Sequence, residues 1–382
     1  MVTPTQGQRP DLLPQGKPRP VEGFELSPVR PASARIGYAV LAGALLLATG
    51  LWIFVDVHPA LASAAGFLTY LVGAYTAYRV AGGVRVARDH LMRGLVYGAF
   101  VLAVLPLVSL LWTVVGQGWV QAVNPDFLLQ TMNGVTGVQD EATMQDGAPL
   151  VGGAYHAVIG TLIITGIATL ISVPIGLFAA IYLVEYGGKN KLSHAIRFLV
   201  DVMTGIPSIV AGLFAFALWA MLFGIGTKDA LAGAVALGVL MIPTVVRNSE
   251  EMLRIVPNEL REASLALGVP KWRTVAKVVL PTAASGLASG VTLAIARVIG
   301  ETAPLLVAVG YARGLNLNPT EGPMSSLAVY AYYMFTRPLN PGFRDPSLER
   351  AWAAALLLVL IVVALNLTAR LIATFFAPKT GR

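Results

Sequence analysis

Long runs of apolar residues alternate with short polar segments along most of the chain. A helix that crosses a membrane needs roughly 20 mainly apolar residues, and eight stretches approach or exceed that length. They are residues 36–57, 61–78, 95–115, 157–183, 198–223, 230–246, 282–309 and 351–375. The pattern therefore predicts an all-α polytopic membrane protein with eight spans.

The composition supports this class and excludes others. Hydrophobic residues make up 56% of the 382 residues, charged residues 12%, and the mean hydropathy is +0.70. Soluble domains carry about 25% charged residues, so a soluble enzyme is excluded. The chain has no Cys and only four scattered His, so we expect neither a metal site nor a catalytic group on it.

The distribution of Lys and Arg predicts the orientation in the membrane. Basic residues gather in the N-terminal tail, in segments 79–93, 189–197 and 247–277, and near the C-terminus. The loop at 116–155 has no Lys or Arg and four acidic residues. Basic loops stay in the cytoplasm, so both termini are expected to be cytoplasmic in a multi-pass cell (inner or plasma) membrane protein. This distribution also assigns the net charge of +7 to cytoplasmic loops, and not to a nucleic-acid partner.

Four parts of the chain follow from these patterns. Residues 1–35 are polar and proline-rich, which is typical of a disordered tail. Next we expect an N-terminal transmembrane hairpin, turned at His58-Pro59 and followed by a basic linker, then a core and a short tail. The boundaries are 36–93 for the hairpin with its linker, 94–376 for the core with a cytoplasmic loop at 247–281, and 377–382 for the tail.

The cytoplasmic loop contains signals for a short helix. Pro257 is favourable at a helix start, and Gly268 is favourable where a helix ends in a left-handed conformation. Pro270 is expected to open a second helix over 271–279, and Pro281 to mark the junction with the next span.

The first of these helices places Leu260, Ala263 and Leu267 on one face. An amphipathic helix of this kind can seat in a groove on a partner protein or lie on lipid headgroups. The residues alone leave both roles open.

The span at 282–309 contains two charged residues, Arg297 and Glu301. Gly300 and Pro304 flank Glu301 and weaken the backbone hydrogen bonding, so we expect this helix to bend there. Charges at this depth are costly and by default mark a functional path. Four residues apart on a helix, the two side chains share a face and can pair, so a structural ion pair is the alternative. A guanidinium matches a tetrahedral oxyanion bidentately, which gives Arg297 a role with an anionic substrate. Arg247 is a weaker candidate, because interfacial anchoring explains it adequately.

No G-x-x-x-x-G-K-[ST] phosphate loop occurs in the sequence. Any ATP hydrolysis must therefore take place on another polypeptide.

Several segments together resemble the phosphate-specific ABC importer family, and specifically its PstA-type permease subunit. The loop is similar to the family's Glu-Ala-Ala coupling motif, with Ser264 and Val278 as mild departures. Ala296 and Ala303-Pro304 favour the PstA type over the PstC type. The resembling segments are 260–272, 294–306, 180–187 and 207–214.

The resemblance implies a fold and a set of roles. The fold is a six-helix ABC type-1 (MetI-like) permease core over about 95–375, preceded by the extra hairpin. The substrate path would involve Arg297, Glu301 and Arg247. Coupling to an ATPase would involve Glu262, Ala263, Ser264, Gly268, Leu280 and Pro281.

The same resemblance implies the partners. They are a PstC-type second permease subunit, a PstB-type ATPase dimer that holds ATP and magnesium, and an extracytoplasmic PstS-type phosphate-binding protein. Membrane lipid surrounds the assembly, and no cofactor is expected on this chain. The expected function is ATP-driven import of inorganic phosphate.

Two alternatives remain. The same machinery can carry molybdate, sulfate or phosphonate, which the coupling loop does not distinguish. A secondary transporter or channel that works without ATP would explain the spans and the buried charge, but not the coupling loop.

Overall fold

The computed structural model describes residues 34–188 and 190–376. Residues 1–33 of the predicted tail at 1–35 and the predicted tail at 377–382 lie outside the described residues, while residues 34 and 35 begin the first helix. The described part has helices and no strands. Six helices are long and apolar enough to cross a membrane, or seven if one sharply bent pair forms a single span. The chain is thus an all-α polytopic membrane protein, while the count of eight spans and the cytoplasmic termini stay predictions.

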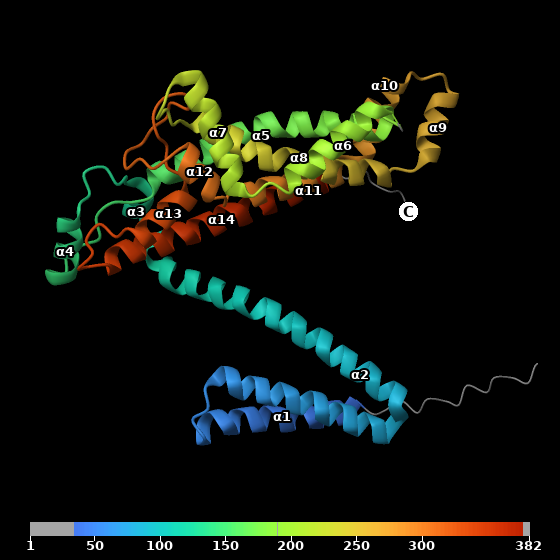
Figure 1. Cartoon of the computed structure of the whole chain (residues 1–382), viewed down its shortest axis with the longest axis vertical. Coiled ribbons are helices and arrows are strands. Elements are labelled where there is room, and N and C mark those ends of the chain that lie inside the picture. Colours follow the sequence, from blue (N-terminus) through green and yellow to red (C-terminus); the bar gives the residue numbers. More distant parts are fainter. Residues whose placement is uncertain (1–33, 189, 377–382) are drawn as a thin grey trace, which may run out of the picture. The chain divides into compact units, whose positions relative to one another are not determined.

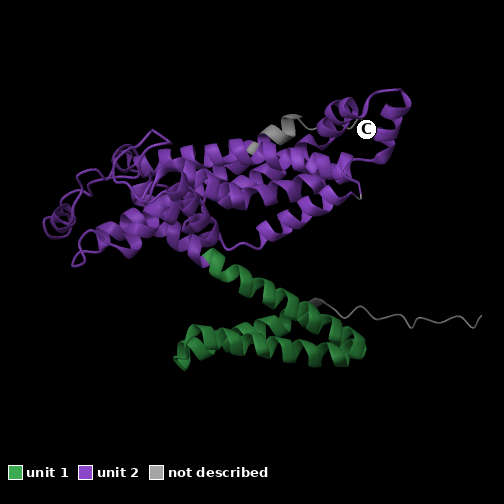
Figure 2. Cartoon of the chain, turned by 45° about the horizontal axis from the view of Figure 1, so that its top comes forward, with its two compact units in different colours: residues 1–108 green, residues 109–382 purple. Residues whose placement is uncertain are grey.

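The chain divides into two compact units after Val108 (Figure 2). The first contains α1 (Ala34–Phe54) and most of α2 (Pro59–Ala122), and the turn between them lies at His58-Pro59 as expected. Inside α2 the backbone turns at Gly83, whose φ is 84° and ψ 178°. The predicted spans 61–78 and 95–115 are therefore the two arms of α2 on either side of this turn.

The second unit holds the remaining helices, which lie largely alongside one another (Figure 1). In chain order they are α3 (Pro125–Leu129), α4 (Gly137–Gln145), α5 (Tyr155–Ile181), the π-helix η1 (Tyr182–Tyr186), α6 (Lys191–Thr204), α7 (Ser208–Phe223), α8 (Ala230–Ile255), α9 (Asn258–Ala266), α10 (Lys271–Thr274), the π-helix η2 (Val275–Val279), α11 (Leu280–Val298), α12 (Ala303–Ala308), α13 (Leu327–Thr336) and α14 (Asp345–Phe376).

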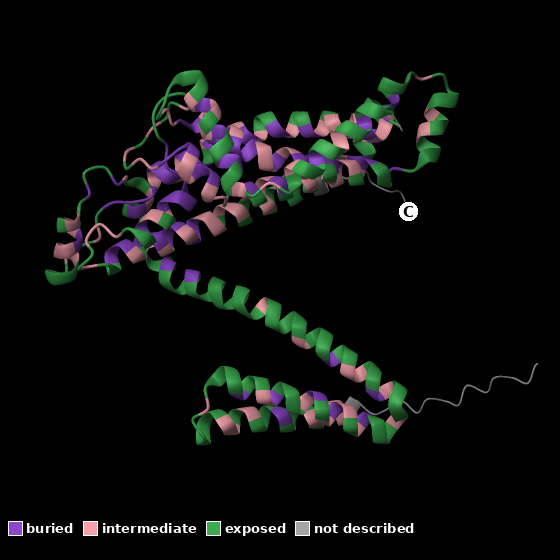
Figure 3. Cartoon of the chain, in the orientation of Figure 1, coloured by how far each residue is buried: buried purple, intermediate pink, exposed green. Residues whose placement is uncertain are grey.

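The core of this unit lies around α8, which packs most extensively against α5 and then against α11. Buried residues lie on the inner faces of the long helices, and exposed residues lie on their outer faces (Figure 3). Small residues allow close approach, as at Gly212 of α7, where an added Cβ would lie 2.6 Å from the Pro304 Cα of α12. Small residues at helix interfaces are typical of membrane helices, because close backbones gain van der Waals contact.

The predicted span 198–223 is not a straight helix. It divides into α6 and α7, which meet at an angle of 107°. Pro207 causes the break, since the residue before a proline is pushed out of the α-region, and Ile206 and Gly205 lie in the turn. Only α7 lies wholly in the predicted range, and α6 is a separate amphipathic helix with exposed Phe198 and Leu199.

The predicted span 282–309 is also interrupted. Helix α11 ends at Val298, and α12 begins at Ala303. The bend expected from Gly300 and Pro304 is confirmed, because Gly300 lies in the gap and Pro304 in the first turn of α12. Consequently Arg297 lies in the last turn of α11, and Glu301 lies beyond the helix.

At the end of the unit away from α9, α4 is held to α14 by a buried ion pair (Figure 1). Arg350 Nη2 lies 2.6 Å from Asp140 Oδ1, and both side chains are fully buried. Ser347 donates to the other oxygen of Asp140, and Arg350 also donates to the carbonyl of Val151. This network fixes the loops at that end of the unit.

Candidate coupling surface and charged pocket

The short helix α9 stands out from the rest of the unit, because none of its residues is buried. It begins after Pro257, and the backbone leaves the helical region at Gly268, whose φ is 75°. The expected left-handed end of the helix is thus confirmed. Leu267 is 83% exposed, and Leu260 and Leu265 are exposed as well. Exposed leucines on a helix with no buried residue indicate a surface that contacts another molecule.

The segment after α9 differs from the expected second helix. Residues 271–279 begin as α10, turn into the π-helix η2, and run into α11 without an interruption. Pro281 therefore lies inside one continuous helical segment, just after the π-helix η2, and does not mark a junction between separate helices.

The predicted coupling residues fall on two elements. On α9, Glu262 and Ala263 are exposed, as is Gly268 just past the helix. Ser264 is half-buried, and its Oγ lies 2.9 Å from Thr274 Oγ1, which joins α9 to α10. The others lie at the start of α11, where Leu280 packs into the core and Pro281 is exposed. The structure therefore brings four of the six together and separates Leu280 and Pro281 from them.

Arg261 anchors α9 to the rest of the unit. Its guanidinium pairs with Glu185 of η1, with Nη2 2.9 Å and Nε 3.0 Å from Oε1. The same group donates to the carbonyl oxygens of Leu253 and Val256, at 2.8 and 2.5 Å, and to Asn258 Oδ1 at 3.2 Å. The side chains of Arg261 and Glu185 are only 15% and 6% exposed.

This contact has a mechanical consequence. It ties three elements together at one point, namely the end of α8, the start of α9 and the π-helix that continues α5. An Arg that satisfies a carboxylate and two carbonyls in a nearly dry site resists displacement, because removing any partner leaves buried charge unpaired. The contact therefore connects α9 to both α5 and α8.

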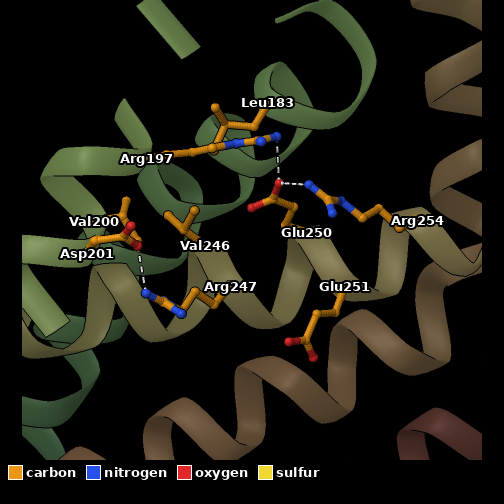
Figure 4. Close-up of a pocket in the computed structure, with 9 residues that line it drawn as sticks. All are labelled: Leu183, Arg197, Val200, Asp201, Val246, Arg247, Glu250, Glu251 and Arg254. Carbon is orange, nitrogen blue, oxygen red and sulfur yellow. Dashed lines mark hydrogen bonds and ion pairs between the residues drawn. The ribbon is translucent and has the colours of Figure 1, made fainter. Parts of the chain in front are cut away.

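A charged pocket of about 240 Å³ lies between α6 and α8, near the same end of the unit (Figure 4). Glu250 accepts from Arg197, at 2.9 Å, and from Arg254. Arg247 donates to Asp201 at 2.6 Å, and both of these side chains are more than half exposed. Glu251 also lines the pocket and points away from the two clusters (Figure 4). Three arginines and three acids line the pocket, so the lining has no net charge to attract an anion.

The structure places Arg297 beside α8. Arg297 Nη1 donates to Thr244 Oγ1 at 3.3 Å, and Thr244 is one turn before Arg247 on α8. Arg297 and Arg247 thus lie on neighbouring helices, and both are exposed. Arg297 is the single charged residue of α11, and a charge on a membrane helix does not face lipid. The hydrogen bond to Thr244 accordingly places the guanidinium against α8.

Glu301 is not paired with Arg297 in the described part of the chain. It is half-buried in the break between α11 and α12, and its backbone N–H donates to the carbonyl of Val298 at 3.1 Å. The end of α11 removes the shared helical face on which the expected pairing depended. A structural ion pair between these two residues is therefore not what holds Arg297 in place.

Sequence reasoning missed the partner of Arg261. Glu185 lies 76 positions away, and no local spacing connects the two. The one available signal was an acidic residue at the cytoplasmic end of a span, with a run of arginines in the next cytoplasmic loop. The pair formed by Asp140 and Arg350, 210 positions apart, was missed for the same reason.

Membrane-crossing helices, an exposed helix anchored to the bundle and a chain without a nucleotide-binding loop are the features of the transmembrane subunit of a transporter. Residues 172–382 match the family model described as binding-protein-dependent transport system inner membrane component. The chain belongs to this family, and it is a multi-pass inner-membrane subunit of an ABC importer, of the PstA permease type.

Two relatives illustrate the similarity. The phosphate transport system permease protein PstA 1 of Mycobacterium tuberculosis (strain H37Rv) is 46% identical over 286 residues, which cover 75% of this chain and 87% of that protein. The permease PstA of Haemophilus influenzae (strain Rd) is 37% identical over 295 residues, 77% of this chain and 96% of that one.

A solved structure of a bacterial ABC transporter involved in the import of the acidic polysaccharide alginate has the same fold. Its TM-score is 0.51 at 12% identity, with 76% of this chain and 97% of that chain covered. This similarity concerns the arrangement of helices alone.

Proposed function

We propose that this chain is the transmembrane permease subunit of an ATP-driven importer of inorganic phosphate. The observation that carries the proposal is the similarity to relatives named as phosphate permeases, which extends over about three quarters of the chain. The exposed helix α9 and the arginines of α8 and α11 supply the parts that such a subunit needs.

We propose that α9 is the contact for the motor. The exposed surface of this helix combines a charged residue, Glu262, with the apolar residues Ala263 and Leu267. Arg261 holds this surface to the helix bundle. Closure of a partner ATPase would push α9, and the buried contact with Glu185 would carry that movement to α5. The helix bundle would then change between states open to one side or the other.

We propose that phosphate passes along the face that holds Arg297 and Arg247, with Glu301 near the break in α11. A guanidinium forms two parallel hydrogen bonds with a tetrahedral oxyanion. Asp201 competes for Arg247 in this structure, so the anion would exchange places with a carboxylate rather than remain bound. This exchange keeps the affinity of the site for phosphate low enough that the phosphate is released.

The proposal requires further chains. A PstC-type subunit would complete the path on the exposed side of Arg297, a PstB-type ATPase dimer would bind α9 and hold ATP with magnesium, and a PstS-type protein would deliver phosphate from outside. ATP hydrolysis would be a property of the whole complex, because this chain has no phosphate loop.

Reconstitution tests the proposal directly. The four kinds of subunit are placed in proteoliposomes, and uptake of radiolabelled phosphate is measured with and without magnesium and ATP. We expect uptake that needs ATP and the binding protein. Competition by molybdate, sulfate and phosphonate at equal concentration tests the other oxyanions, and a stronger effect than that of unlabelled phosphate would reassign the cargo. Uptake by the chain alone down a gradient would favour a secondary transporter.

A further inference from the structure

The first compact unit carries a group of arginines that the proposed transport function does not use. Its described residues, 34–108, contain five arginines and two acidic residues. Arg79 precedes the turn at Gly83, and Arg85 and Arg88 follow it. Arg35 lies at the same end, because Gly37 of α1 packs against Tyr78 of α2, where an added Cβ would lie 2.8 Å from the hydroxyl oxygen. We refer to Arg35, Arg79, Arg85 and Arg88 as the basic turn.

The turn holds a defined geometry. Gly83 adopts a positive φ that other residues rarely take, and the rings of Tyr78 and His90 stack across it with centroids 3.6 Å apart. Tyr78 is 4% exposed. The two arms of α2 are therefore joined by a tight, packed turn, and the arginines on it keep fixed positions relative to the two spans.

None of the four arginines of the basic turn forms an ion pair within residues 34–188 and 190–376. The unit's remaining arginine, Arg93, pairs with Asp89 at 3.0 Å, and the other acid, Asp56, lies at the opposite end, in the loop between α1 and α2. The guanidinium of Arg79 lies 6.0 Å from the centre of the Tyr75 ring. All four side chains of the basic turn are exposed, so their charge is available to an external anion.

The surroundings identify the anion. The turn joins two apolar helical arms, so its arginines lie at the level where the membrane meets the cytoplasm. Val80 is 90% exposed and Val84 43%, which puts apolar side chains among the arginines. Unpaired arginines beside exposed valines match the surface of a lipid bilayer, which has charged headgroups above apolar acyl chains. Clusters of four or more basic residues next to a membrane helix favour anionic lipid.

We propose that the basic turn binds the headgroups of anionic phospholipids in the cytoplasmic leaflet. The guanidinium groups pair with headgroup phosphates, and Val80 and Val84 contact the upper acyl chains. The hairpin is thereby held at a fixed depth and recruits anionic lipid around this unit.

Fluorescence quenching by brominated lipids measures the local lipid composition. Because the chain has no cysteine, Val80→Cys provides one labelling site on the basic turn. Val55→Cys, at the opposite end of the hairpin and 62% exposed, is the matched control. Each protein is labelled with bimane and reconstituted with its complex in vesicles that contain either brominated phosphatidylglycerol or brominated phosphatidylcholine at equal mole fraction.

We expect phosphatidylglycerol to quench the label at position 80 several-fold more than phosphatidylcholine, and both lipids to quench equally at position 55. Each arginine near an anionic surface contributes about fivefold in affinity, so replacing Arg79, Arg85 and Arg88 by Gln lowers affinity roughly a hundredfold. The quenching ratio is the quenching by phosphatidylglycerol divided by that by phosphatidylcholine. The glutamine substitutions should lower this ratio at position 80 to its value at position 55. Lysine at the same three positions should preserve the preference.

Two measurements separate this role from others. Labelling at position 55 with an impermeant reagent verifies that the glutamine variant keeps its orientation, and high salt applied to the unsubstituted arginines should abolish the preference without any substitution. Equal quenching ratios at positions 80 and 55 would overturn the proposal. Displacement of phosphatidylglycerol by inorganic phosphate, beyond the effect of chloride at equal ionic strength, would also overturn it and indicate a site for the free anion.

Discussion

The contact between Arg261 and Glu185 leads to a quantitative prediction about coupling. Replacing Arg261 by Met removes the guanidinium and leaves the Glu185 carboxylate, 6% exposed, without its partner. Breaking a buried ion pair in this way costs about 3–5 kcal/mol. The carbonyls of Leu253 and Val256 lose a donor at the same time. We therefore expect α9 to detach locally from the bundle, with the rest of the unit intact.

Hydrogen exchange and transport together measure this effect. A cost of about 3–5 kcal/mol raises the local opening equilibrium by roughly two to four orders of magnitude, so amides of residues 253–266 should exchange faster by that factor. Phosphate uptake by the reconstituted complex should fall sharply, while ATP hydrolysis continues without transport.

The matched control is Arg254→Met. Arg254 also pairs with a glutamate, Glu250, but its side chain is 57% exposed, and exposed pairs contribute at most about 1 kcal/mol. Exchange and uptake should change little in this variant. The double substitution Arg261→Glu with Glu185→Arg should restore part of the protection from hydrogen exchange and part of the phosphate uptake. Normal exchange and normal uptake in Arg261→Met would refute the proposed anchoring of α9.

Three further predictions concern single side chains. Arg297→Gln should abolish phosphate uptake while the ATPase still co-purifies with the chain; uptake at the normal rate would exclude the path assigned to Arg297. Glu262→Lys reverses an exposed charge on α9 and should weaken co-purification of the ATPase at least tenfold in a pull-down from mild detergent, whereas unchanged recovery would count against the contact. Asp140→Asn breaks the fully buried pair with Arg350 and should destabilise the second unit by about 3–5 kcal/mol; a thermal unfolding midpoint equal to that of the unsubstituted protein would show that the pair contributes nothing net.

The apolar runs predicted most of the helices, since the length and periodicity of such runs depend on local sequence alone. The turn at His58-Pro59, the left-handed Gly268 and the break near Gly300 and Pro304 all followed from residues whose backbone preferences are strong. Pro207 marks an interruption in the span at 198–223, but the size of the bend there, 107°, depends on tertiary packing and does not follow from the residues alone.

The candidate site was predictable only in part. The exposed residues of α9 could be assigned to a short helix from the sequence. Pro257 precedes that helix, and Gly268 and Pro270 follow it, so local backbone preferences define both of its ends. The anchor of that helix could not be assigned, since Glu185 reaches Arg261 through the packing of η1 against the end of α8. Arg297 was identified by its charge in an apolar segment, but its neighbour Thr244 comes from another helix. Contacts between distant segments depend on tertiary packing, which residue spacing does not encode.

Accessibility of α9 from the two sides of the membrane tests the central claim, that an ATPase docks on this helix in the cytoplasm. Leu267→Cys introduces the chain's one thiol at a residue that is 83% exposed, and Leu317→Cys, 64% exposed in the loop between α12 and α13, is the control. A membrane-impermeant maleimide should label position 267 in inside-out vesicles and not in intact cells, and bound ATPase should protect it, while position 317 should show the opposite sidedness. Labelling of position 267 from outside intact cells would contradict the account.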